Sequence, residues 1–173
     1  AIYSNMATKK EKEYAYEDAL LSIEARMETE KAPISFLSNV AAVLHQALIK
    51  AGLNINWCGF YLVSGDVLVL GPFQGKAACW RISKGKGVCG TAWATAQTQV
   101  VKDVHEFPGH IACDSQTNSE IVVPVKNEKG EVVAVIDVDA LELSSFGDEE
   151  REFLEKAERI LSPFDFGQLA KPE

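Results

Sequence analysis

The sequence predicts an α/β protein of the α+β kind, in which a central, mostly antiparallel sheet is flanked by helices. Helical patterns occupy the first third and the end of the chain, whereas short β-prone segments fill the middle. These segments follow one another across short turns, and one internal helix interrupts them. The 173 residues are 47% hydrophobic and contain no Pro- or Ser-rich linker, so one domain with one core is expected.

This single domain, residues 1–173, is expected to have three parts. Residues 1–9 are predicted to be disordered or left over from cloning, although the residues before Met6 would also suit the end of a longer native segment. Residues 10–52 are predicted to form N-terminal helices. Residues 55–161 are predicted to hold the sheet, the loops of the site and the last helix.

The N-terminal part contains two helical patterns. Residues 10–30 are rich in Glu, Ala, Leu, Arg and Met, which favours an amphipathic helix. Pro33 then opens a second helix, whose apolar residues recur at helical spacing. Gly52 follows as a stop signal.

The middle of the chain changes to the period of strands. Strands are predicted for INWCGFYLV at residues 55–63, VLVLGPF at 67–73 and ACWRIS at 78–83. A helix is then predicted for residues 87–97 and a further strand for 98–104. The sheet should therefore be built largely from this region.

The remainder of the chain combines a loop, a hairpin and a helix. Residues 105–119 lack periodicity and should form a long loop, and such loops are often functional. Strands 120–125 and 131–139 are predicted to pair across a four-residue turn. Ser145, followed by acidic residues, is predicted to cap a helix that runs to about Leu161.

Charge and hydropathy exclude several function classes. The net charge of −8 and the pI near 5.0 argue against nucleic acid or an anionic membrane as partner and favour a small polar substrate. No apolar segment reaches the roughly 18 to 20 residues of a membrane span, and the N-terminus is too polar for a signal peptide. A cytoplasmic protein is therefore expected, in which four cysteines serve as reduced or reactive thiols rather than as a disulfide scaffold.

Three acidic residues are predicted to converge on the hairpin. Asp137 and Asp139 lie two residues apart and so share one face of their strand. The expected register places Glu120 opposite Asp137 to within one residue. Because like charges repel, such a cluster favours a cationic ligand, a metal or a raised pKa, although a solvated strand end is the alternative.

Three cysteines lie in frames that contain glycine or histidine: GPFQGKAAC, GKGVCGTA and FPGHIACD. Cys89 is predicted at a helix N-terminus, where free N–H groups stabilise a thiolate, and is on that ground a candidate nucleophile. Cys113 lies in the long loop, which suits a thiol that attacks and exchanges, and Cys79 begins a strand. Cys58, in an apolar strand, is predicted to be packed and inert. For the other three, a buried apolar role stays open.

Two further patterns are weaker. Gly85 to Gly90 matches GxGxxG, but no parallel βαβ series follows it, which argues against a nucleotide site. The cysteines and histidines of the middle region include no CxxC or HxxxH pair that would anchor zinc. Neither a nucleotide site nor a zinc site is therefore expected.

The segment from Ile55 to Asp139 resembles the free methionine-(R)-sulfoxide reductases, a family built on a single GAF domain. The resemblance rests on INWCGFYLV, LGPFQGKAAC, GKGVCGTA, FPGHIACD, SEIVVPV and VIDVD, in that order. Generic GAF sensor domains share the fold but not these cysteine frames. The resemblance implies a GAF-like fold and an oxidoreductase, an L-methionine (R)-S-oxide reductase, that acts on free methionine sulfoxide.

The resemblance also implies roles for individual residues. Cys113 corresponds to the thiol that attacks the sulfoxide, Cys79 to the main resolving thiol and Cys89 to a second thiol able to form the disulfide. The resemblance therefore implies Cys113, rather than Cys89, as the nucleophile. Trp57 and Tyr61 would pack beside the sulfur end of the substrate, with ordinary sheet packing as the alternative.

Substrate binding is implied for Glu120, Asp137 and Asp139, because three carboxylates complement the ammonium group of a free amino acid. Attack is expected to leave a sulfenic acid on Cys113, which condenses to an intramolecular disulfide that thioredoxin or another dithiol reduces. A homodimer is an expectation from the resemblance alone. A non-catalytic GAF sensor of a small molecule and a thiol redox sensor remain the alternative functions.

Overall fold

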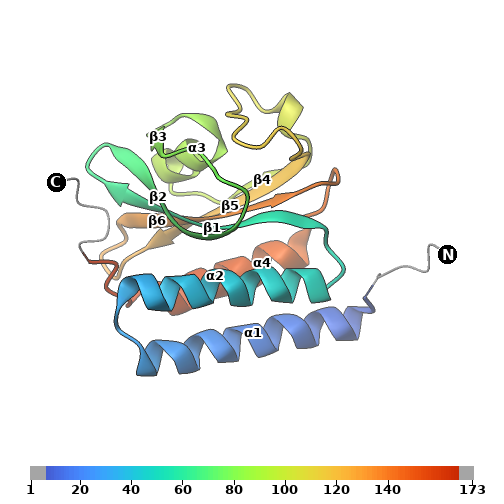
Figure 1. Cartoon of the computed structure of the whole chain (residues 1–173), viewed down its shortest axis with the longest axis vertical. Coiled ribbons are helices and arrows are strands. Elements are labelled where there is room, and N and C mark those ends of the chain that lie inside the picture. Colours follow the sequence, from blue (N-terminus) through green and yellow to red (C-terminus); the bar gives the residue numbers. More distant parts are fainter. Residues whose placement is uncertain (1–6, 168–173) are drawn as a thin grey trace.

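The structure is a computed structural model that describes residues 7–167. Its helices are α1 (Lys9–Thr29), α2 (Pro33–Lys50), α3 (Gly87–Thr95) and α4 (Asp148–Leu161), with a 3₁₀ turn, η1 (Val104–Glu106). Its strands are β1 (Ile55–Ser64), β2 (Val67–Gly75), β3 (Arg81–Ser83), β4 (Gln99–Val101), β5 (Ser119–Lys126) and β6 (Val132–Ala140). The predicted α+β class, an antiparallel sheet flanked by helices, is confirmed (Figure 1).

The six strands form one sheet in the order β3-β2-β1-β6-β5-β4, and every neighbouring pair is antiparallel. Strands β1 and β6 occupy its centre and pair with each other along most of their length. The central strands are largely buried because helices or loops cover both faces of the sheet. Side chains on their two faces therefore point into two different environments.

One face of the sheet packs on α2 and α4, and α1 forms a further layer outside them (Figure 1). The larger core lies here and includes Cys58, Phe60 and Leu62 of β1. The other face is covered by α3 and irregular loops, and it carries a smaller core with Trp57 and Tyr61. This division follows from the alternation of side chains along a strand.

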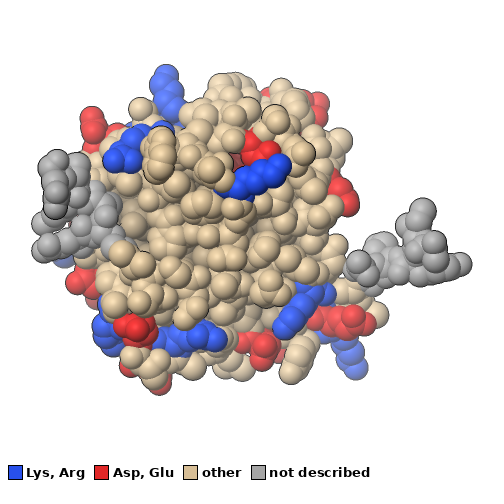
Figure 2. All heavy atoms as spheres, viewed as in Figure 1, with Lys and Arg blue, Asp and Glu red and all other residues tan. Residues whose placement is uncertain are grey.

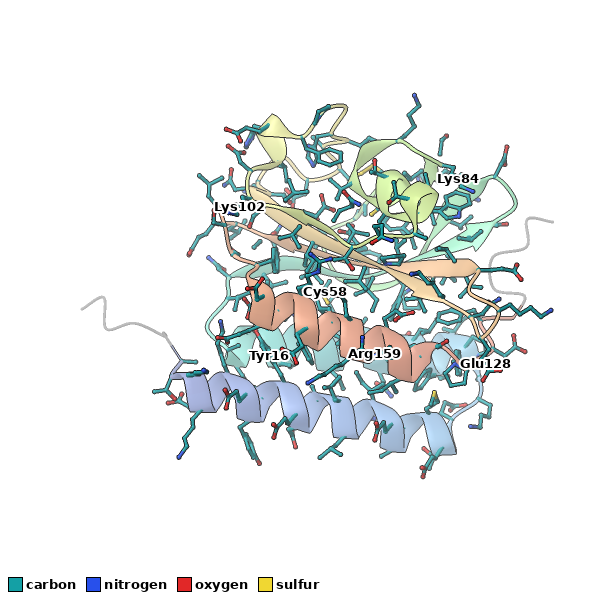
Figure 3. All side chains as sticks on the ribbon, turned by 180° about the vertical axis from the view of Figure 1, so that it is seen from behind. Tyr16, Cys58, Lys84, Lys102, Glu128 and Arg159 are labelled. Atoms are coloured by element: carbon teal, nitrogen blue, oxygen red, sulfur yellow. A yellow bond between two sulfur atoms is a disulfide. The ribbon has the colours of Figure 1, made fainter. Side chains whose placement is uncertain are left out.

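Helix α1 is attached through one buried acid of α4. Glu150 accepts a hydrogen bond from the Tyr16 hydroxyl at 2.8 Å and forms an ion pair with Lys12 at 3.0 Å. The Tyr16 ring also stacks on Phe153, with ring centroids 4.2 Å apart. Figure 3 shows Tyr16 between the helices on this side of the sheet. These contacts fix α1 to the helical layer rather than to the sheet.

Several element ends differ from the prediction. Ser145 does not cap α4, because the Glu150 side chain accepts a hydrogen bond from the Gly147 N–H and the helix begins at Asp148. Helix α3 ends at Thr95, two residues early, since Ala96 adopts a left-handed conformation with φ of 54°.

Two predicted strands are shorter than expected. The strand predicted for 78–83 covers only β3, because the carbonyls of Lys76 and Cys79 in the preceding loop accept hydrogen bonds from side chains of β1 instead of pairing with β2. The strand predicted for 98–104 covers only β4, because Asp103 accepts a hydrogen bond from the His105 N–H and starts η1. Both shortened strands lie at edges of the sheet.

At the N-terminus, Thr8 caps α1 by accepting a hydrogen bond from Glu11, and the helix begins one residue before the predicted start. Residues 1–6, which belong to the segment predicted to be disordered or left over from cloning, lie outside the described residues. Within residues 7–167, no helix combines the length and apolar character needed to cross a membrane. In Figure 2 most charged side chains lie in the upper third and along the lower edge of the face, with a broad uncharged area between them.

Candidate active site

A disulfide joins Cys79 and Cys113, which are 34 residues apart in sequence and have Cα atoms 5.6 Å apart. Cys79 lies in the loop between β2 and β3, and Cys113 lies in the loop between η1 and β5. The first loop is tied to the sheet by two side chains of β1. The Trp57 indole N–H donates to the Lys76 carbonyl at 3.1 Å, and the Tyr61 hydroxyl donates to the Cys79 carbonyl at 3.0 Å.

The second loop is tied to the start of β1 by Asn56. Its Nδ2 atom donates to Asp114 Oδ2 and to Thr117 Oγ1, both at 3.0 Å. The Gln116 N–H also donates to Asp114, and these hydrogen bonds lower the pKa of the Asp114 carboxyl. The segment around Cys113 is therefore ordered by contacts on the side of the loop that faces the sheet.

A small cavity of about 40 Å³ lies between the two loops, α3 and the sheet. Its lining residues are Trp57, Tyr61, Ala77, Ala78, Ile82, Lys86, Gly87, Val88, Cys89, His110, Ile111, Cys113, Asp114, Thr117, Glu120, Asp137 and Asp139. Gly87 has a φ of 62°, and a Cβ atom there would lie 3.1 Å from Ile111. Glycine at this position therefore lets the loop with Cys113 close over the start of α3.

Three carboxyl groups form the floor of the cavity. Glu120 of β5 pairs directly with Asp139 of β6, and Asp137 lies two residues along β6 on the same face. Glu120 and Asp137 are buried, and Asp139 is partly exposed. Burial is the main cause that raises the pKa of each carboxyl, and the negative charge of its neighbours raises it further.

Two oxygen atoms of this cluster have no hydrogen-bond partner within residues 7–167, namely Oδ1 of Asp137 and Oδ1 of Asp139. Buried acceptors without a partner are costly, and in native proteins they are usually satisfied by a ligand or by water. The cluster is therefore suited to a ligand that donates several hydrogen bonds and carries positive charge.

Comparison with known proteins agrees with this site. A GAF-domain model matches residues 35–159. The free methionine-R-sulfoxide reductase of Saccharomyces cerevisiae is 42% identical over 165 residues, which cover 94% of this chain and 92% of the yeast protein. The enzyme of the same name from Escherichia coli is 44% identical over 155 residues, covering 87% and 91%. The chain belongs to the GAF-domain family of free methionine-R-sulfoxide reductases.

A solved structure of this family supports the assignment at the level of the fold. The free methionine-R-sulfoxide reductase from Neisseria meningitidis, determined in complex with its substrate, has a TM-score of 0.83 and 41% identity. The match covers 95% of this chain and 95% of that protein. The family membership inferred from the cysteine frames is thus confirmed, whereas the role of each residue in this chain stays a prediction.

Cys89 differs from the prediction made from its position in the helix. It occupies the start of α3 as predicted, but only 4% of it is exposed, and its sulfur lies within 4.8 Å of oxygen atoms of Glu120 and Asp137. Burial, followed by the charges of Asp137 and Glu120, raises the pKa of the Cys89 thiol. Since burial and the adjacent carboxyls outweigh the helix terminus, this thiol is not activated in the disulfide-bonded structure.

The register predicted for the hairpin is wrong by two residues, because Glu120 pairs with Asp139 and Val122 with Asp137. A β-bulge between Val125 and Lys126 changes the pairing near the turn. A shift of two residues keeps every side chain on its face. The acids therefore converge as predicted although their partners differ.

The two aromatic residues face the cavity from β1. Trp57 and Tyr61 are buried, and their ring centroids are 5.8 Å apart, while Phe73 stacks on Trp57 with ring centroids 5.0 Å apart. Cys58, between them in sequence, points to the opposite face and is buried in the larger core. Burial raises the pKa of the Cys58 thiol, which agrees with the packed, inert thiol predicted for this position.

The sequence predicted no role in the reductase site for Asn56, Lys86 or His110, yet these residues lie around it. His110 Nε2 lies 3.7 Å from Glu120 Oε1, and burial lowers the pKa of the imidazole. Lys86 lines the cavity beside the first residues of α3. Only the GHIAC and GKG frames, which contain His110 and Lys86, gave a signal for these residues.

Proposed function

We propose that this protein reduces free L-methionine-(R)-sulfoxide to L-methionine through a thiol, a sulfenic acid and an intramolecular disulfide. The observation that carries this proposal is the shared cavity, since the Cys79–Cys113 disulfide and the carboxyls of Glu120, Asp137 and Asp139 line the same small space. A redox-active thiol pair and an anionic amino-acid pocket are thus joined in one site. The names of the relatives described above support the same activity.

The acid cluster is proposed to bind the ammonium group of the substrate. A methionine within a peptide chain lacks this group, so a pocket with partnerless oxygens on Asp137 and Asp139 selects the free amino acid. Trp57 and Tyr61 then offer an apolar wall for the S-methyl end. Recognition of a charge at one end and of an apolar group at the other orients the sulfoxide within the cavity.

In the proposed reaction the Cys113 thiolate attacks the sulfoxide sulfur, while a carboxyl of the cluster donates a proton to the sulfoxide oxygen. The raised pKa values of Glu120, Asp137 and Asp139 keep a proton within the cluster for this purpose. The sulfur–oxygen bond of the substrate breaks, methionine leaves, and the oxygen remains on Cys113 as a sulfenic acid.

Cys79 is proposed to resolve this intermediate, because its sulfur already contacts that of Cys113 in the structure. Attack by the Cys79 thiol releases the oxygen as water and forms the disulfide. Cys89 is proposed as a second resolving thiol that lines the same cavity. Thioredoxin or another dithiol in the reducing cytoplasm then restores both thiols, and no metal or organic cofactor takes part.

The disulfide-bonded cavity is too small for the substrate. A volume of about 40 Å³ accommodates about three water molecules, so the loops with Cys79 and Cys113 must separate before an amino acid enters. Reduction of the disulfide removes the covalent link between these loops. The proposed cycle therefore couples reduction of the protein to access for the next substrate. A homodimer stays a prediction.

The proposal is tested by following methionine release from free methionine-(R)-sulfoxide, from the (S) epimer and from N-acetylmethionine sulfoxide, with dithiothreitol as reductant. Turnover of the free (R) form far above that of the other two is expected, and it should be lost in Cys113→Ser and kept in Cys58→Ser. Consumption of none of the three, with thiols that titrate as reduced, would favour a sensor.

Cys89, Glu120 and Asp137 also place three potential metal-ligand atoms within 4.8 Å of one another. The same assay therefore includes protein treated with a chelator and dialysed. Unchanged turnover is expected, because the proposed chemistry needs only thiols and a proton donor. Activity that is lost with the chelator and restored by a divalent ion would assign these three residues to a metal centre instead.

A further inference from the structure

The charge of the chain is distributed unevenly. Residues 67–102 contain five basic residues and no acidic residue, whereas the rest of the chain contains the other 12 basic residues and all 25 acidic residues. The positively charged segment carries Cys79. Four of its basic residues, Lys76, Arg81, Lys84 and Lys86, are exposed and follow one another within 11 residues around that cysteine.

Apolar side chains are exposed at the same place. Trp80 adjoins Cys79 and is 76% exposed, the largest value among the exposed large hydrophobic residues between 7 and 167. Ile111, two residues before Cys113, is 38% exposed. Each cysteine of the disulfide therefore lies near an exposed apolar side chain in the sequence. Both cysteines are themselves partly exposed. An exposed tryptophan is typical of an interaction site.

None of these basic residues forms an ion pair within residues 7–167, although the charge of Lys76 helps to lower the pKa of the nearby Asp114 carboxyl. Asp114, which follows Cys113, already accepts hydrogen bonds from Asn56 and from the Gln116 N–H. Lys76 donates to the neutral side chain of Gln116, and Lys84 lies over the ring of Trp93. Figure 3 shows Lys84 beside α3, on the side of the sheet opposite α4. The positive charge on this surface therefore remains free to attract a partner.

We propose that this surface is the docking site of the protein that reduces the disulfide, and that this partner is an acidic protein with a dithiol at its contact surface. The disulfide surface is defined as Lys76, Trp80, Arg81, Lys84, Lys86 and Ile111. This inference rests on the proposed function, since it concerns the recycling step of that activity. The basic residues steer an acidic partner toward the surface, and Trp80 packs against the apolar area around its thiol.

Docking places the partner beside Cys79. One partner thiolate attacks the Cys79 sulfur, the Cys79–Cys113 bond breaks, and Cys113 leaves as a thiolate. The second partner thiol then attacks the mixed disulfide, which releases the Cys79 thiolate and leaves the partner oxidised. Two electrons pass from the partner's dithiol to Cys79 and Cys113. The two thiol protons of the partner balance the two protons that convert the Cys79 and Cys113 thiolates to thiols. Cys113 is thereby free for another substrate.

The test compares two reductants in steady-state reduction of methionine-(R)-sulfoxide, an acidic thioredoxin recycled by its reductase and the small molecule dithiothreitol. Trp80→Ala and Arg81→Glu are each expected to lower kcat/KM for thioredoxin by about tenfold, which corresponds to about 1.4 kcal/mol of docking energy. The rate with dithiothreitol should stay unchanged. The effect of Arg81→Glu should diminish as salt is added.

Matched controls are provided by sites on other surfaces. Tyr14 on α1 is 73% exposed, so Tyr14→Ala removes an exposed aromatic ring of similar accessibility, and Lys129→Glu reverses one charge at the hairpin turn. Both controls should keep the wild-type rate with thioredoxin.

The outcomes separate this inference from the proposed function. No turnover with dithiothreitol would overturn the proposed function. Turnover with dithiothreitol, combined with a thioredoxin rate that neither Trp80→Ala nor Arg81→Glu lowers, would overturn only the docking site. A Trp80→Ala protein with an altered sedimentation coefficient would assign the surface to a second copy of this chain and would likewise overturn it.

Discussion

Glu120 on β5 and Asp139 on β6 are directly paired across the central part of the sheet, with Asp137 two residues away on the same face. Three carboxyls in a cavity that also holds Cys89 repel one another and are poorly hydrated. Such an arrangement lowers the stability of the folded protein when all three are ionised. It also creates the negative electrostatic potential that attracts an ammonium group. The same three carboxyls therefore destabilise the empty site and stabilise the site with a bound ammonium group.

The acid cluster is predicted to make stability fall as the pH rises. Its carboxyl pKa values are raised above the ordinary values of 3.8 for Asp and 4.5 for Glu, so the folded state binds more protons than the unfolded state. The contribution of the cluster to the free energy of unfolding is fully present at pH values below the ordinary pKa values. It is lost as the pH rises through the raised pKa values of the folded state. Asp137→Asn should therefore gain stability relative to wild type as the pH increases.

Urea unfolding of both proteins at a series of pH values from about 4 to about 8 measures this difference. Asp66→Asn, in the exposed turn between β1 and β2, serves as the control and should follow the wild-type curve. Parallel curves for wild type and Asp137→Asn would show that the cluster carries no such linkage.

Cys79 and Cys89 are predicted to contribute unequally to resolution of the sulfenic acid. Cys79 is already bonded to Cys113, whereas Cys89 is buried with a raised pKa. Cys79→Ser should lower steady-state turnover with thioredoxin by at least about tenfold, and Cys89→Ser should change it by no more than about twofold, because exchange requires an accessible thiolate. Steady-state rates decide the question, and a larger loss in Cys89→Ser would reverse the two assignments.

The ammonium group of the substrate is predicted to be essential for recognition. N-acetylation removes its charge, so wild-type kcat/KM for N-acetylmethionine-(R)-sulfoxide should be lower by about a hundredfold or more than for the free form. Asp139→Asn should lower kcat/KM for the free form much more than for the acetylated form, because Asp139 contributes an oxygen atom that lacks a partner within residues 7–167. Equal losses on both substrates would place the ammonium group elsewhere.

Tyr61 is predicted to hold the loop of Cys79 on the sheet. Tyr61→Phe removes the hydroxyl that donates to the Cys79 carbonyl at 3.0 Å, and this should lower the free energy of unfolding by about 0.5 to 1.5 kcal/mol. Tyr14→Phe alters an exposed tyrosine and provides the control. Urea unfolding of the oxidised proteins measures both, and unchanged stability in Tyr61→Phe would show that this hydrogen bond does not restrain the loop.

The sequence predicted the sheet and the convergence of the acids because both depend on the two-residue period of strands. The period keeps Glu120, Asp137 and Asp139 on one face even though the bulge at Val125 and Lys126 shifts their partners. Bulges leave little trace in a single sequence, so the register itself was not predictable. The motif frames around Cys79 and Cys113 identified the family because they are specific in composition and order.

The environment of Cys89 was not predictable from its position in the helix. A helix N-terminus lowers the pKa of a thiol, but the tertiary structure places Glu120 and Asp137 beside this sulfur. Those carboxyls are more than 30 residues away in sequence. Likewise, Asn56 contacts Asp114 only because β1 passes under the loop with Cys113. Local patterns do not encode such long-range contacts.

The central claim is that Cys113 attacks a sulfoxide held by the acid cluster. It is tested most directly in the Cys79→Ser/Cys89→Ser double variant, reduced, freed of reductant and mixed with free L-methionine-(R)-sulfoxide. Acid quenching should yield one methionine per protein, and a dione specific for sulfenic acids should label Cys113. Release of no methionine by protein whose Cys113 titrates as a free thiol would contradict the claim.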